Sequence, residues 1–515
     1  MDRTTANQPT VRQGSPWLVL VALAIGVMME AMDSTVITVA NPAISAEMNA
    51  GLPALQWLAN GYMITQAVLL IAAGKLGDRF GHRRMFFIGL VGFVVASVLV
   101  GVSQTITQMI GFRLLQGAFS ALLLPSAMGL LRLVFPPEKL KMAIGAFMSA
   151  FVVGGVIGPL VGGAIVNVTT WRWVFFINVG LGAIAFVMGL LTLRRTPVIS
   201  EPRPLDLPGI ALLTAAMLSL VLAITQGPFR GWTSAFTLVC LVLAVVFGTL
   251  FVLRERSVDA PALPLSMFRT GPVSASVLAT MITGGLSFGS WFYVMLYLQN
   301  VHGYRPLQAA LFLLPVTILF VVGSPIGGGL NQKFGPKVPM LAGMLLVAIG
   351  AFGLSQLTAS SPYLAIWPFL ALTGLGVSFV VPTATEVIVS HAPVEMAGVA
   401  SGLGQTALLG GNILGIAVIG AIISGRVTAT LPGHLADEGA PAEVATALLG
   451  QASHVAEGRV PEMAGQSADA MRQIVAAAHS AFMDGMNVAL LVTAIVVVLA
   501  MGLISLVRKA PVEAP

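Results

Sequence analysis

The sequence predicts an all-α membrane protein whose helices form two related groups of six, with two more helices between the groups. Its 515 residues are 57% hydrophobic and only 9% charged, whereas soluble domains have roughly 25% charged residues. Apolar runs of about 20 residues recur along the chain, and each is long enough to cross a bilayer as a helix. The short alternating segments of a membrane β-barrel do not occur in the sequence.

The apolar runs place about 14 spans in chain order. We expect them at residues 17–40, 55–74, 84–103, 108–131, 143–165, 171–193, 207–226, 234–253, 273–299, 307–330, 338–357, 364–390, 398–423 and 486–507. Residues 1–16 and 508–515 are then short tails outside the bilayer. The first run is longer than the apolar core of a signal peptide, so we expect it to remain as a spanning helix.

A repeated motif divides these spans into groups. The stretch G-K-L-G-D-R-F-G-H-R-R at 74–84 returns in degenerate form as G-G-L-N-Q-K-F-G-P-K at 328–337, 254 residues later. We therefore expect an N-terminal six-helix bundle at 17–193 and two inserted helices at 207–253. A C-terminal six-helix bundle follows at 273–507 and includes a long extracellular loop at 424–485. Internal repeats of this kind give many transporters two halves that move against each other.

The distribution of positive charge orients the chain. Of the 26 Lys and Arg residues, 19 fall on the side of the N-terminus, 6 fall on the opposite side, and Arg113 lies within a span. Because positive residues are retained on the cytoplasmic side, we predict that both termini are cytoplasmic. The net charge of +6 is spread over short loops, which argues against nucleic acid as a partner.

Several kinds of chemistry are disfavoured by the sequence. Cys240 is the one cysteine, which excludes an internal disulfide, and we expect it to pack as a small apolar residue. No Walker loop, Cys-x-x-Cys pair or metal-ligand spacing occurs. We therefore predict no catalytic residue and no metal site, and we expect neither ATP nor a redox cofactor to supply the energy.

The loop at 74–84 is a candidate gate at the cytoplasmic face. Gly74 and Gly81 allow a tight turn and close approach of helices. Asp78 can pair with Arg79, with Arg83 or with the end of a neighbouring helix. The basic residues also anchor the loop on the cytoplasmic side whether or not the loop acts as a gate.

Charged residues are predicted within the membrane in the first and fourth spans. Glu30 and Asp33 lie three residues apart in the first span and so share a helix face. Arg113 lies in the fourth span at a similar depth, so an ion pair between Asp33 and Arg113 is plausible. Buried charges in a bilayer are expensive and indicate function. The alternatives are that one carboxyl is a structural hydrogen-bond anchor and that Arg113 reaches the outer interface.

The fifth and twelfth spans carry further candidate residues. Gly154, Gly158 and Gly162 recur every four residues and predict close helix packing, with Gly163 beside them. Pro159 predicts a bend in the same helix. Glu386, near the cytoplasmic end of the twelfth span, could bind a proton or a cation, or could equally reach water at the interface.

Together these stretches resemble the major facilitator superfamily, and the 14-span plan resembles its drug:proton antiporter-2 branch of multidrug and quaternary-ammonium exporters. The loop at 74–84 matches the motif after the second span, and residues 154–163 match the antiporter motif of the fifth. Other matches are Asp33, Thr35 and Pro42 in the first span, Arg113, Gln116 and Gly117 in the fourth, and Trp171, Arg172, Trp173, Phe176 and Asn178 in the sixth. Glu30 does not belong to the usual motif of the branch.

The resemblance implies a major-facilitator fold and proton-coupled export of small lipophilic compounds, cationic or neutral, across the bacterial inner membrane. The proton motive force would replace a cofactor, and a monomer would suffice. Proton coupling is then expected at Asp33, Glu30 and Arg113. A substrate cavity is expected at Glu386, Trp291, Tyr293, Tyr297, Gln299 and Gln116, although Tyr297 could instead belong to an aromatic belt at the outer interface.

Other functions stay open at this point. One is export of an endogenous antibiotic or lipid by the same kind of carrier. A membrane sensor would normally carry a soluble output domain, and a lipid-modifying enzyme would need a cluster of polar groups at one interface. The sequence contains neither feature in a convincing form.

Overall fold

The computed structural model describes residues 15–48, 50, 52–193, 206–231, 233–258, 263, 267–268, 271–392, 396–439, 448, 452–460 and 468–506. The predicted tails at 1–16 and 508–515 therefore lie almost wholly outside the described residues. Within these ranges, 13 helices are long and apolar enough to cross a membrane. The predicted second span forms a further helix, α2, which is 29 residues long and less apolar.

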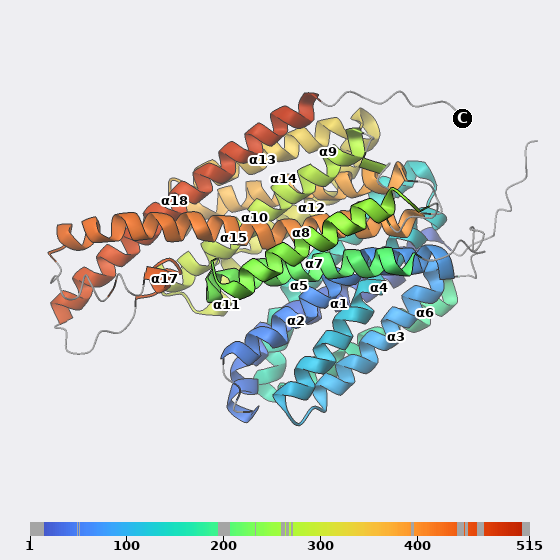
Figure 1. The fold of residues 1–515 in the computed structure, drawn as a ribbon, viewed down its shortest axis with the longest axis horizontal. Helices are drawn as coiled ribbons and strands as arrows, with labels where there is room; N and C mark the ends of the chain where they lie inside the picture. Colours follow the sequence, from blue (N-terminus) through green and yellow to red (C-terminus); the bar gives the residue numbers. More distant parts are fainter. Residues whose placement is uncertain are drawn as a thin grey trace, which may run out of the picture.

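The first six predicted spans each form one helix (Figure 1), and α1, α2 and α5 extend up to eight residues beyond the predicted bounds. They are α1 (Pro16–Met48), α2 (Leu52–Phe80), α3 (His82–Gly101), α4 (Ile106–Val134), α5 (Pro137–Val168) and α6 (Trp173–Thr192). Within this group, α1 packs on α5 and α6, and α4 packs on α2 and α3. We refer to α1–α6 as the N-terminal group.

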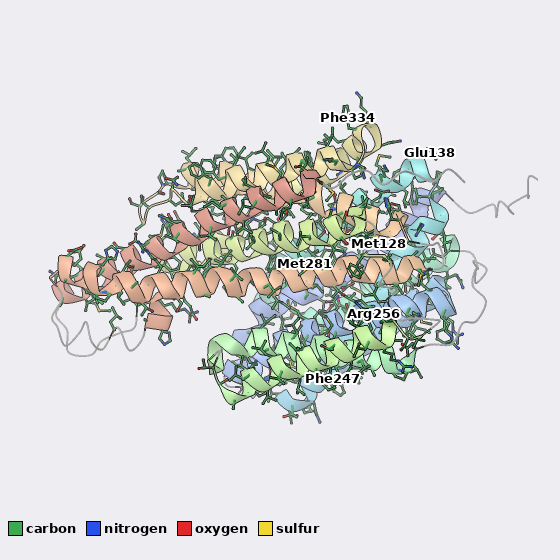
Figure 2. All side chains as sticks on the ribbon, turned by 45° about the horizontal axis from the view of Figure 1, so that its top comes forward. Met128, Glu138, Phe247, Arg256, Met281 and Phe334 are labelled. Atoms are coloured by element: carbon green, nitrogen blue, oxygen red, sulfur yellow. The ribbon has the colours of Figure 1, made fainter. Side chains whose placement is uncertain are left out.

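The inserted pair consists of α7 (Leu207–Arg230) and α8 (Ala235–Glu255). Helix α7 contacts both α2 and α15 (Ala397–Asp437). Helix α8 exposes Val242, Val245 and Leu253, and Figure 2 shows Phe247 of α8 near the rim of the bundle. Apolar side chains on an outer face are suited to contact with lipid. Cys240, also in α8, is buried as predicted.

The remaining helices form a C-terminal group in which two predicted spans are interrupted. The ninth span comprises α9 (Gly271–Ala279), the π-helical turn η2 (Thr280–Gly284), α10 (Gly285–Leu296) and the π-helical turn η3 (Tyr297–Val301). The tenth comprises α11 (Pro306–Phe312) and α12 (Leu314–Phe334). The others are α13 (Lys337–Leu354), α14 (Tyr363–Ser390), α15, the short α17 (Ala452–Val455) and α18 (Ala468–Leu506).

The prediction of a loop over 74–84 is wrong for most of its residues. Helix α2 continues to Phe80 and α3 begins at His82, so only Gly81 separates them. Gly81 has φ +90°, a conformation that glycine adopts without a steric penalty. Gly74 lies inside α2, where a Cβ atom would come within 2.2 Å of the Gly398 carbonyl oxygen. Its small size therefore serves close helix packing rather than a turn.

The prediction of a long loop at 424–485 is also wrong in part. Helix α15 continues to Asp437 and α18 begins at Ala468, while residues 440–447, 449–451 and 461–467 lie outside the described residues. With 41 residues, α15 is about 60 Å long at 1.5 Å per residue, twice the roughly 30 Å of a hydrocarbon core. Helices α15 and α18 project together past the ends of the other helices (Figure 1). Buried apolar residues spaced four apart, Val427, Leu431 and Leu435, line the extension of α15.

The two groups are joined toward their predicted cytoplasmic end. Helix α2 packs on α15, and α5 packs on α12. Ser324 Oγ donates to the Gly145 carbonyl oxygen at 2.9 Å, and Ser149 Oγ donates to that of Val321 at 3.1 Å. Small residues at these crossings let the backbones approach closely.

An exposed polar contact fixes the opposite end of α1. Glu47 accepts hydrogen bonds from Trp171 Nε1 at 2.7 Å and from Arg172 Nη1 at 2.6 Å. These two donors, with Arg172 the larger influence, lower the pKa of Glu47 from its usual value. The contact ties α1 to the segment before α6.

A lowered carboxyl pKa in the folded protein stabilises the fold above the pKa of the unfolded chain, and this contribution is lost as the pH falls through the folded-state value. We therefore expect Glu47→Gln to reduce the melting temperature slightly at pH 7 and to make no difference once the pH is well below 4. Thermal unfolding of detergent-purified protein at several pH values measures this effect. A difference between the two proteins that stays constant over the whole pH range would contradict it.

Candidate functional site

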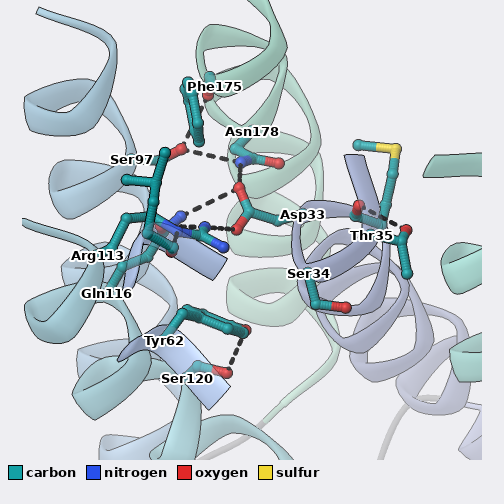
Figure 3. Close-up of polar contacts among 12 residues, drawn as sticks. Asp33, Ser34, Thr35, Tyr62, Ser97, Arg113, Gln116, Ser120, Phe175 and Asn178 are labelled. Carbon is teal, nitrogen blue, oxygen red and sulfur yellow. Dashed lines mark hydrogen bonds and ion pairs between the residues drawn. The ribbon is translucent and has the colours of Figure 1, made fainter. Parts of the chain in front are cut away.

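The candidate site is a cluster of polar side chains around Asp33, in the middle of the N-terminal group (Figure 3). Arg113 Nη1 lies 2.5 Å from Asp33 Oδ2, and both side chains are completely buried. Gln116 Nε2 donates to Asp33 Oδ1 at 3.1 Å, and Asn178 Nδ2 donates to the same oxygen at 2.6 Å. The predicted ion pair is confirmed, and two amide groups complete it.

Four helices supply this cluster. Asp33 lies on α1, Arg113 and Gln116 lie one turn apart on α4, and Asn178 lies on α6. From α3, Ser97 Oγ accepts a hydrogen bond from Asn178 at 2.9 Å and donates to the Phe175 carbonyl oxygen at 3.0 Å. Hydrogen bonds within a buried polar network hold its helices in one arrangement.

Arg113 is held from several sides. Its Nη1 also donates to Gln116 Oε1 at 2.8 Å, and its Nε donates to the Leu58 carbonyl oxygen at 3.3 Å. Its guanidinium carbon lies 4.5 Å from the centre of the Tyr62 ring, a cation–π distance. Its Nη2 has no hydrogen-bond partner among the described residues. These contacts exclude the alternative that Arg113 reaches the outer interface.

Glu30 lies on the same helix as Asp33 but in a separate network. Gln66 Nε2 donates to Glu30 Oε1 and, at 3.0 Å, to Ser120 Oγ. Ser120 also hydrogen-bonds to the Tyr62 hydroxyl at 2.8 Å (Figure 3). Glu30 Oε2 is buried and has no hydrogen-bond partner among the described residues.

The candidate gate residues meet the other helix group. Asp78 Oδ1 accepts from the Gly398 amide at 2.7 Å, and Oδ2 accepts from the Val399 amide at 3.0 Å. These amides open α15, so the carboxylate occupies a helix N-terminus, where negative charge is favoured. The end of a neighbouring helix, one of the partners proposed from the sequence, is therefore observed.

The basic residues of the motif have local contacts. Arg83 Nε donates to the Leu193 carbonyl oxygen at 2.8 Å, within the N-terminal group. The Arg79 guanidinium lies 5.3 Å from the centre of the Phe80 ring. Neither contact joins the two helix groups.

The glycine face of the fifth span packs against α1. A Cβ atom at Gly154 would lie 2.3 Å from the Met28 carbonyl oxygen, and one at Gly158 would lie 2.2 Å from Thr35 Oγ1. At Gly162 the nearest atom would be Val36 Cγ2, at 2.4 Å. The close packing predicted from the four-residue spacing is therefore present. Pro159 and Gly163, the neighbouring residues of this motif, lie within α5 and are partly buried.

Glu386 is buried, at 7% exposure, and takes part in a second network at the interface between the groups. Asn331 Nδ2 on α12 donates to Glu386 Oε2 at 3.0 Å. Lys141 Nζ on α5 donates to Asn331 Oδ1 at 3.4 Å. Glu386 is thus linked through an amide to a cation of the other group, and it lies apart from the Asp33 cluster.

The candidate cavity residues do not form one set. Gln116 belongs to the Asp33 cluster. On α10, Trp291 Nε1 donates to Thr373 Oγ1 at 2.9 Å. Tyr297 is completely buried, and its hydroxyl donates to the Thr358 carbonyl oxygen at 2.7 Å. Burial excludes Tyr297 from a lipid-facing aromatic belt.

Two other candidates lie on the same segment. Tyr293 is partly buried near α15, where a Cβ atom on Gly420 would come within 2.3 Å of its hydroxyl oxygen. Gln299 is partly buried in the π-helical turn η3.

Several residues of these networks were not candidates from the sequence. They are Tyr62, Gln66, Ser97 and Ser120 around the first span, and Arg132, Lys141 and Asn331 at the interface. Arg132 donates to the Val389 and Ala392 carbonyl oxygens at the end of α14. Asn178 was named only as part of the sixth-span motif, and a role could have been assigned to it because a polar residue in an apolar span needs a partner. The hydroxyls carry no such signal, because a helix can satisfy them internally.

Removing one partner of a buried ion pair leaves an uncompensated charge, which costs about 3–5 kcal/mol. We expect Arg113→Met to lower the unfolding free energy by about that amount. The double variant Asp33→Asn with Arg113→Met should lose less unfolding free energy, because neither charge of the pair stays buried. Thermal unfolding in detergent measures both, with Arg172→Met as the control, because this change removes a partly exposed ion pair worth about 1 kcal/mol or less. Equal losses in the single and double variants would contradict the charge argument.

Comparison with known proteins identifies the family. Residues 23–416 match the family model described as Major Facilitator Superfamily. The chain is 41% identical over 503 residues to the "Tetracenomycin C resistance and export protein" of Streptomyces glaucescens, covering 97% of this chain and 93% of that protein. It is 30% identical to the "Multidrug efflux pump LfrA" of Mycolicibacterium smegmatis, covering 97% of each.

Solved structures agree on the fold. The human organic anion transporter MFSD10 aligns with a TM-score of 0.59 at 12% identity, covering 94% of this chain and all of that chain. The proton:xylose symporter XylE aligns with a TM-score of 0.59 at 14% identity, covering 96% of each chain. With the family model matching most of its length, this chain belongs to the Major Facilitator Superfamily.

Proposed function

We propose that this protein exports small lipophilic compounds, cationic or neutral, across the cytoplasmic membrane of a bacterium in exchange for protons. Relatives covering nearly the whole chain are a resistance and export protein for tetracenomycin C and a multidrug efflux pump. The observation that carries the proton coupling is the buried pair of carboxyl side chains on α1, of which Asp33 is paired with Arg113 and Glu30 is not.

The contacts between the helix groups support alternating access. Asp78 holds the N-terminus of α15, and Arg132 holds the C-terminal carbonyls of α14. The negative charge of Asp78 lies at the partially positive N-terminus of α15, and the positive charge of Arg132 lies at the partially negative C-terminus of α14. Away from these contacts, α2 of the N-terminal group and α15 of the C-terminal group diverge (Figure 1). We infer an arrangement that is closed on the cytoplasmic side and that opens when these contacts, and the others between the two groups at this side, break.

Coupling then requires only that proton and cargo stabilise different states. A proton entering from outside neutralises a carboxyl on α1 and favours return to the inward-facing state. Cargo binds from the cytoplasm once that proton has left. For a neutral cargo, the membrane potential contributes about 2.3 kcal/mol per net charge moved per 100 mV, and the pH gradient adds to it. A monovalent cation exchanged for one proton moves no net charge, so that exchange is driven by the pH gradient.

A second candidate is export of an antibiotic made by the same organism. The specific observation in its favour is the 41% identity to the tetracenomycin C export protein. This reading keeps the same site and mechanism and differs in the cargo.

Transport by purified protein in liposomes tests the proposed function. With an acidic lumen and a neutral exterior, we expect accumulation of tetraphenylphosphonium in the lumen, and collapse of the pH gradient should abolish it. A protein with both Glu30→Gln and Asp33→Asn should fail to accumulate the cation. Accumulation that does not depend on the gradient would reject proton coupling. Accumulation by empty liposomes is the background to subtract.

The proposed closure at the cytoplasmic side gives a separate prediction. Asp78→Asn removes the charge at the α15 N-terminus, and hydrogen bonds to charged groups contribute about 1.5–3 kcal/mol. In a Cys240→Ala background, a cysteine replacing the buried Ser149 should therefore react with a maleimide about tenfold faster in the Asp78→Asn protein. Arg84→Gln, an exposed neighbour on α3, is the control. Equal labelling rates in the two variants would contradict the role of Asp78 in closure.

A further inference from the structure

The two carboxyl groups on α1 differ in how completely they are satisfied. Both oxygens of Asp33 accept hydrogen bonds, one from a guanidinium and the other from two side-chain amides. All three donors belong to buried residues. Arg113 depends on this carboxylate, because without it the guanidinium would be an uncompensated buried charge, which is strongly unfavourable.

Glu30 has the opposite character. It is 2% exposed, and Oε1 accepts from the neutral amide of Gln66. Oε2 is buried with no hydrogen-bond partner among the described residues, and no Lys or Arg forms an ion pair with Glu30 there. A buried carboxylate without a cation is costly. A positive charge at Oε2, supplied by a proton or by cargo, removes that cost.

We propose that Glu30 carries the exchanged proton, and that Asp33 is a positioning residue which fixes Arg113 and Gln116. The assignment rests on the proposed function. A proton from outside binds Glu30 Oε2 and converts the side chain to the neutral acid. The proton is later released to the cytoplasm. The resulting carboxylate then compensates the positive charge of a lipophilic cation. Proton and cationic cargo thus compete for one oxygen.

The surroundings of Glu30 connect the two networks. The titratable groups close enough to interact with the charge of Glu30 are Asp33 on α1 and Tyr62 on α2, and Tyr62 in turn interacts with Arg113 on α4. Helix α6 carries no titratable side chain, and those of α5 lie within its first five residues. Tyr62 joins the networks, because its hydroxyl bonds Ser120 while its ring packs on the Arg113 guanidinium. A change in the charge of Glu30 can therefore affect the contacts of α2 and α4.

The test is the pH dependence of tetraphenylphosphonium binding to the detergent-purified protein. If one proton competes with the cation, affinity falls by up to about tenfold per pH unit on the acidic side. We expect this slope of affinity against pH in the wild-type protein and an affinity that does not change with pH in Glu30→Gln. Asp33→Asn should bind more weakly or be less stable but should keep the slope. Glu30→Asp, which retains a carboxyl, should restore it.

A second measurement covers variants that fold poorly. Adding the cation to protein in weak buffer should release close to one proton per bound cation from wild type, and none from Glu30→Gln. Asn178→Ala removes one donor of Asp33 without changing any charge, and it should release the proton as wild type does. Gel filtration confirms that each sample is folded.

Different outcomes test the assignment of the proton to Glu30 and the proposed function separately. A retained slope in Glu30→Gln, or a slope lost in Asp33→Asn and Asn178→Ala, would overturn the assignment of the proton to Glu30. If Glu30→Gln liposomes still accumulate cation in response to the gradient, this assignment fails while the proposed function stands. If the wild-type liposomes show no proton-linked accumulation, the proposed function itself is wrong.

Discussion

The ion pair between Asp33 and Arg113 is the constraint on which the N-terminal group depends. Two full charges cannot be left in a low-dielectric interior without close partners. The 2.5 Å contact meets that requirement only if α1 and α4 cross at one depth and in one orientation. Gln116 and Asn178 then satisfy the remaining acceptor sites, which fixes α6 as well. The glycine face of α5 lets that helix lie close against the same stretch of α1.

The two helix groups are held together in a different way. Within the N-terminal group, charges are compensated by side chains at fixed positions. Between the groups, Asp78 and Arg132 instead contact backbone atoms at the ends of α15 and α14. Contacts with helix ends are local, and they separate without leaving a full opposite charge buried. A rigid half with a detachable interface is the combination that alternating access requires.

The two carboxyl groups of α1 show how one helix face can serve two roles. A carboxylate with a guanidinium and two amides holds its environment in place. A carboxylate with neutral donors alone, and with one oxygen that has no partner among the described residues, is open to a second ligand. The difference arises from the neighbouring helices, since both residues belong to the same few turns of α1. Stability and exchange are thereby assigned to separate side chains three residues apart.

The sequence by itself determined the membrane environment, the positions of the helices and the internal repeat, because hydropathy and glycine spacing act over one or two helical turns. It also indicated Asp33 with Arg113, since a charge in an apolar span requires a partner. Only the tertiary structure decided that Asp78 caps α15 and that Gln66 donates a hydrogen bond to Glu30. It also decided that α15 and α18 continue as helices where a loop was predicted. Those contacts join residues dozens to hundreds of positions apart, and no local pattern encodes which distant donor will face a given oxygen.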